Sequence, residues 1–101
     1  MDKQAIQQQM HIKLMVQSAV TAAYSAGREF RKNGGDEQTT MIEIKQRATA
    51  LANNIIRIRG LDDGDGENIT EDLIENCTLA FQDKYDLDDL ISGAFEHIYD
   101  F

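Results

Sequence analysis

The chain has 101 residues, no proline, no tryptophan, one cysteine and a net charge of −8 at pH 7. This length is enough for one domain with a modest core, the absence of proline permits long helices, and a lone cysteine excludes an internal disulfide. The acidic balance argues against direct nucleic-acid binding, because neutralised phosphates supply most of that affinity. No stretch approaches the roughly 20 apolar residues of a membrane span. We therefore expect a single domain over 1–101 in the cytoplasm.

Apolar residues in the N-terminal segment recur at alternating spacings of four and three residues, which places them on one helix face. The sequence predicts a helix over 3–32, and Asn33, Gly34 and Gly35 end it because they accept the left-handed conformation of a helix C-cap. We expect the apolar stripe to lie in a helix–helix contact and to provide a surface for self-association. It consists of Ile12, Val16, Ala19, Ala23, Ala26 and Phe30.

A second helix is predicted over 40–59. Thr40 and Glu43 form a capping-box pattern at its start, and Gly60 follows its last apolar position. The polar linker between the two periodic segments is short, so we expect an antiparallel helical hairpin.

Two shorter helices are predicted to follow an acidic loop over 62–67. A second capping box, with Asn68 or Thr70 as the cap and Glu71 reaching back, starts a helix over 69–84. Asp86 then caps a helix over 87–99. The fold predicted from the sequence is an all-α bundle of about four helices, with a long N-terminal hairpin and two shorter C-terminal helices.

Charge divides the chain into two halves. Residues 1–60 carry a net charge of +4, and residues 61–101 carry −12. Such asymmetry concerns partners or association more than the fold. One interpretation is a solvated face that keeps a small protein soluble, and the other is a carboxylate array that binds a basic partner. The carboxylates expected on rigid helices are Glu71, Asp72, Glu75, Asp88, Asp89 and Glu96.

The sequence lacks the residue spacings of several known binding and catalytic motifs. With Gly66 at position 6 of a calcium-binding EF-hand loop, Leu61 falls at position 1 and Asp72 at position 12, so the ligand set is incomplete. No phosphate-binding loop or nucleophile elbow is present. Basic residues occur near helix ends, where compensation of the helix dipole accounts for them. We expect no catalytic site, no metal site and no cofactor.

Two functions fit the sequence best, ahead of a small-molecule or cation binder between protomers, and no motif ties the sequence to a family. The first is a non-enzymatic protein that binds a basic, possibly nucleic-acid-binding, surface of a partner protein as an inhibitor or adaptor. The alternative is a homo-oligomeric helical module, dimeric or larger, whose acidic surface serves solubility. The salt dependence of binding distinguishes the two functions. High ionic strength weakens binding to a basic partner and leaves self-association through an apolar surface intact.

Overall fold

The computed structural model describes residues 3–99, and these residues form four helices and no strand. They are α1 (Lys3–Asn33), α2 (Glu37–Arg59), α3 (Asp63–Gln82) and α4 (Leu87–Tyr99). The all-α prediction is confirmed, as are the stop after Asn33 and the stop at Gly60. Gly60 has φ 65°, and Leu61 N donates to Ile56 O, so α2 ends in a Schellman motif.

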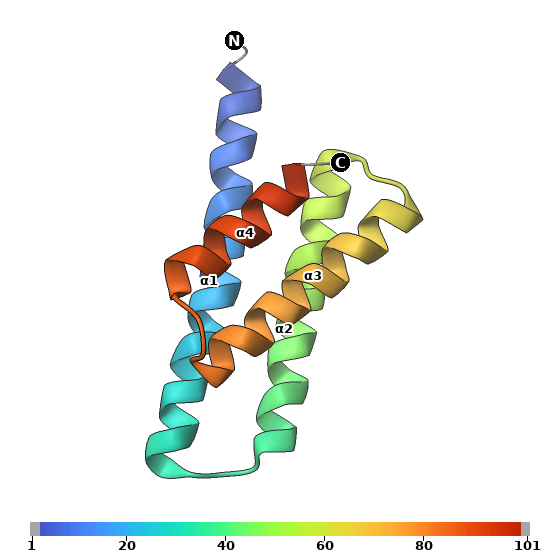
Figure 1. Ribbon diagram of the computed structural model, residues 1–101. Helices are drawn as coiled ribbons and strands as arrows, with labels where there is room; N and C mark the ends of the chain where they lie inside the picture. Colours follow the sequence, from blue (N-terminus) through green and yellow to red (C-terminus); the bar gives the residue numbers. More distant parts are fainter. Residues whose placement is uncertain (1–2, 100–101) are drawn as a thin grey trace.

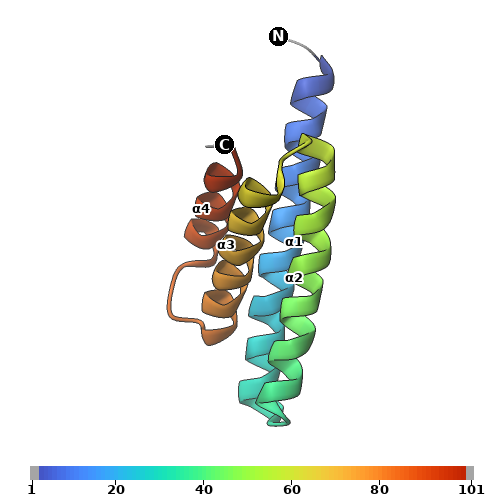
Figure 2. The same cartoon turned by 90° about the vertical axis from the view of Figure 1, so that its right-hand side faces the viewer.

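The helices lie in two layers (Figure 2). The antiparallel hairpin of α1 and α2 is one layer, and α3 and α4 lie side by side in the other. Figure 1 shows α3 running obliquely across both hairpin helices, and the N-terminal part of α1 extending beyond the end of α2. Both α1 and α2 contact α3 more extensively than they contact each other. The second layer therefore holds the hairpin together.

One apolar core joins the two layers, and it contains most of the predicted stripe. Ile12, Val16, Ala19 and Ala23 are 0–2% exposed, and they share the core with side chains from all four helices. Ala26 and Phe30 are half-buried, and the Phe30 ring lies 5.8 Å from that of Phe81. The stripe is thus covered by its own chain. Its four most deeply buried side chains leave little surface of their own for self-association.

The predicted start of α2 at Thr40 is wrong, because Asp36 caps the helix earlier. The Asp36 carboxylate accepts hydrogen bonds from Gln38 N, Thr39 N and the Thr39 hydroxyl. The Thr40 hydroxyl donates to Asp36 O and so lies within the first turn. These hydrogen bonds, the Thr39 hydroxyl first, hold the pKa of Asp36 below its ordinary value of 3.8.

The predicted acidic loop over 62–67 is also wrong, since most of it is the first turn and a half of α3. Asp62 is the N-cap and accepts from Asp65 N at 2.8 Å. Asn68 and Thr70 lie inside the helix, where the Thr70 hydroxyl donates to Gly66 O. α3 ends at Gln82, and Asp83 adopts the left-handed conformation with φ 55°.

Glycines set the two places where α3 crosses the hairpin. A Cβ added to Gly27 of α1 would lie 2.1 Å from Phe81 O, so the two backbones are in direct contact. A Cβ added to Gly66 of α3 would instead meet side-chain atoms of Ile56, the nearest at 3.0 Å. A glycine inside a helix permits either a bend or the close approach of another backbone, and at Gly27 the structure shows the close approach.

Candidate functional site

Four carboxylates follow one another along α3 at intervals of four residues. Asp63, Glu67, Glu71 and Glu75 are all exposed, and the helical repeat arranges them as a slowly winding line of charges about 6 Å apart along the axis. We call these four residues the acidic ridge. The helix fixes their spacing, so a partner would meet a preformed array.

No residue of the described chain neutralises the ridge. The two ion pairs found among residues 3–99 join Arg31 to Asp83 and His97 to Asp72, and neither includes a ridge residue. Like charges four residues apart on a helix cost about 0.2–0.5 kcal/mol per pair, so three consecutive pairs cost α3 roughly 1 kcal/mol. Asp63 lies in the first turn, where the helix dipole favours a carboxylate. The repulsion along the rest of the ridge opposes the stability of the helix that carries it.

An acidic hollow of about 340 Å³ adjoins the ridge at the seam between α2 and α3. Asn53 and Ile56 of α2 form one wall. The opposite wall belongs to the N-terminal half of α3 and includes three ridge residues, Asp63, Glu67 and Glu71. The hollow is open to solvent and combines an apolar wall with carboxylates, which suits the aliphatic stem and charged head of a long basic side chain.

The structure keeps two of the predicted α3 residues in the ridge and separates the third. Glu71 and Glu75 belong to it, whereas the Asp72 side chain points towards α4, where Oδ2 lies 3.0 Å from His97 Nδ1. That side chain is only 25% exposed. Asp72 therefore joins α3 to α4 and presents little charge to a partner.

The predicted residues of α4 are exposed but form no line. Asp88 and Asp89 occupy its first turn, where carboxylates favour the positive end of the helix dipole. Asp86 caps the helix, as predicted, by accepting from Asp88 N at 3.0 Å. Glu96 lies near the other end of the helix and is exposed. The ridge residues that the sequence prediction missed, Asp63 and Glu67, are on α3.

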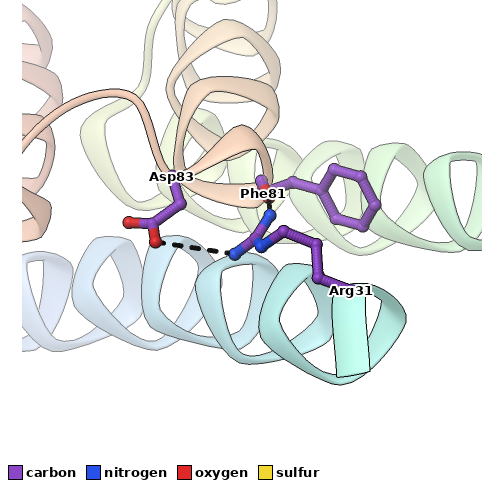
Figure 3. A network of polar contacts seen from close by, with 3 residues as sticks. All are labelled: Arg31, Phe81 and Asp83. Atoms are coloured by element: carbon purple, nitrogen blue, oxygen red, sulfur yellow. Dashed lines mark hydrogen bonds and ion pairs between the residues drawn. The ribbon is translucent and has the colours of Figure 1, made fainter. Parts of the chain in front are cut away.

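Two arginines of the hairpin contact the ends of the second layer. Arg31 Nη1 donates to Phe81 O at 2.5 Å, and its Nη2 lies 3.7 Å from Asp83 Oδ2 (Figure 3). Arg59 Nη1 donates to Ile98 O at 2.5 Å. Each guanidinium thus binds a carbonyl in the last turn of a helix in the other layer, where helix carbonyls lack intrahelical partners. Both residues serve the fold beyond compensating their own helix dipoles.

The described residues show no arrangement typical of metal or nucleophilic chemistry. No group of three or more His, Cys, Asp or Glu side chains within 3–99 is placed to hold a metal ion. Cys77 is buried in the middle of α3, and burial raises the pKa of its thiol to about 12. A thiol with so high a pKa is protonated at neutral pH and is a poor nucleophile.

Comparisons with known proteins add no further indication. No family model matches the chain, and neither a curated protein nor a solved structure matches it. Within residues 3–99, none of the helices combines the length and the apolar character that a membrane span needs. Among the described residues, the acidic ridge and its adjoining hollow form a charged surface without an ion-pair partner.

Proposed function

We propose that this protein is a non-enzymatic interaction protein that binds a basic surface of a partner protein through the acidic ridge. The observation that supports the proposal is the alignment of Asp63, Glu67, Glu71 and Glu75 on one rigid helix without a neutralising group among the described residues. The role that follows is that of an inhibitor or adaptor, because a partner's lysines and arginines would be covered.

The physical case rests on two opposing contributions. The ridge destabilises free α3, and a cationic partner would turn that repulsion into attraction. The helix also fixes the carboxylates before binding, so less conformational entropy is lost than with charges on a mobile loop. Charge complementarity of this kind acts mainly on the association rate and makes binding dependent on salt.

The test compares two double charge reversals that change the net charge equally. Glu67→Lys with Glu71→Lys alters the ridge, and Glu29→Lys with Glu37→Lys alters exposed acids of the hairpin. Partners captured from the native host by the unaltered protein are identified by mass spectrometry, and their association rates are then measured with each purified variant. We expect the ridge variant to associate at least several-fold more slowly and the hairpin variant to match the unaltered protein.

The same measurements contain the result that contradicts the proposal. Partners that bind the ridge variant as quickly as the unaltered protein, with binding unaffected by high salt, would show that the ridge only serves solubility. Circular dichroism on each variant verifies that the helices are retained. Since both ridge substitutions lie outside the first turn of α3, they do not remove a cap.

A further inference from the structure

The outer face of the hairpin, opposite the second layer, contains a groove between α1 and α2. It has a volume of about 130 Å³, and its walls are four alanines of α1 and a stretch of α2 that includes Ile44. No residue of α3 or α4 lines it. Ala19, Ala23 and Ile44, which also belong to the core, form the floor of the groove, and its mouth is not covered by α3 or α4.

Glu43 and Arg47 lie on the α2 rim of this groove, one helical turn apart. A Glu followed four residues later by a basic residue normally pairs on the same helix, yet neither side chain has an ion pair within the described part of the chain. Both are exposed. When a second copy packs antiparallel against the first, the glutamate of each copy faces the arginine of the other, so both charges gain an opposite partner.

The α1 side of the same face bears no charge over residues 14–27. Leu14 at its start is 63% exposed, and Ser18, Thr21, Ala22 and Ser25 continue along the helix as small side chains. The shared lining of the groove places Ala22 level with the turn from Glu43 to Arg47. A second copy approaching here meets no uncompensated charge on α1.

We propose that this outer face is a homodimer interface in which two copies pack antiparallel about a two-fold axis near Ala22, with Glu43 of each copy opposite Arg47 of the other. The described residues extend over 47 × 25 × 17 Å. Their broad face is wide enough to bury the roughly 800 Å² per partner that a stable interface needs. Both acidic ridges remain exposed on the two outer sides of such a dimer.

The experiment is sedimentation equilibrium on the full chain with two charge-swap variants, Glu43→Arg and Arg47→Glu. Each variant places like charges opposite each other twice, so we expect its dimer dissociation constant to rise about tenfold or more. An equal mixture of the two variants restores both opposite-charge contacts, and we expect a heterodimer that is tighter than either variant alone. Glu75→Arg on the ridge is the matched control and should dimerise like the unaltered protein.

Two results would overturn the proposal. One is an unaltered protein that stays an 11.4 kDa species at high micromolar concentration. The other is a pair of variants that dimerise as tightly alone as when mixed. The dimer proposal does not depend on the ridge. Glu75→Arg should weaken partner binding without changing the dimer, so this variant distinguishes a failure of the dimer proposal from a failure of the proposed function.

Discussion

The charged side chains at the ends of the hairpin helices and those of the acidic ridge in the second layer act on the fold in opposite ways. In the hairpin, Arg31 and Arg59 donate to carbonyls of the second layer, and Asp36 caps α2. In the second layer, the ridge carboxylates have no ion pair within the described residues and repel one another. The polar groups of the hairpin thus stabilise the fold, whereas the ridge lowers its stability, which is the pattern expected where a surface serves binding.

The largest effect is expected where the layers touch through their backbones. Gly27→Ala would place a methyl group 2.1 Å from Phe81 O, and since no side chain can move aside there, the helices themselves must separate. We expect a loss of about 3 kcal/mol in the free energy of unfolding, at the upper end for overpacking. Urea unfolding followed by circular dichroism measures it.

Gly66→Ala is the control for that substitution, because the same methyl group meets only side-chain atoms of Ile56 at the other crossing. Ile56 can change its position by a few tenths of an ångström, so we expect a smaller loss, about 1 kcal/mol. Equal losses of unfolding free energy at Gly27 and Gly66 would show that the backbone contact between α1 and α3 tolerates a methyl group as well as the side-chain contact does.

Removal of a hairpin charge should also destabilise the protein. Arg31→Met loses the hydrogen bond to Phe81 O, for which we expect a loss of about 1 kcal/mol. The ion pair with Asp83 adds little, because both side chains are more than 40% exposed. Lys32→Met, on the same exposed helix end, should change stability by less than about 0.5 kcal/mol. Thermal unfolding of the two variants decides whether Arg31 joins the layers.

Removal of a ridge charge should have the opposite sign. Glu71→Gln relieves repulsion from both Glu67 and Glu75, so we expect the protein to gain about 0.5 kcal/mol. The gain should shrink in 1 M salt, where charges are screened within about 3 Å. A loss of stability that does not depend on salt would mean that Glu71 makes a structural contact, and the contrast between the layers would fail.

The smallest effect concerns the pH dependence of the hairpin. Folding lowers the pKa of Asp36, so its stabilisation is present above its ordinary pKa of 3.8 and is lost as the pH falls through the lower value of the folded state. Asp36→Asn keeps a capping side chain that does not titrate. The advantage of Asp over Asn should therefore be constant near neutral pH and be lost as the pH falls below the ordinary pKa of 3.8 and through the lower pKa of the folded state. Urea unfolding at a series of pH values measures it.

The sequence pattern, read from apolar periodicity, capping residues and glycine stops, was enough to predict the four helices, their order and the stops at Asn33 and Gly60. It failed at two helix starts for an identifiable reason. The capping-box patterns at Thr40 and Asn68 occur inside helices, while the true caps are the earlier aspartates Asp36 and Asp62. Local patterns cannot rank two competing caps, since the choice depends on where the next helix packs.

The candidate site was only partly predictable for the same reason. Gly64 and Gly66 are typical of a loop, but Gly66 is helical, and its missing side chain lets α3 approach Ile56 closely. If the predicted helix had begun at Asp63, the spacing of four residues between its carboxylates would have revealed the ridge. The contact between Asp72 and His97 joins residues far apart in sequence. No local pattern predicts it.

The order of the layers along the chain has a consequence for biosynthesis. The hairpin is complete at Gly60, yet the residues that cover its inner face come from α3 and α4. During translation, which releases the N-terminal part first, Ile12, Val16 and Ile55 of the growing chain face water until those helices emerge. A chaperone that shields apolar surface therefore has a defined window of action, which opens when the hairpin leaves the ribosome and closes when α4 does.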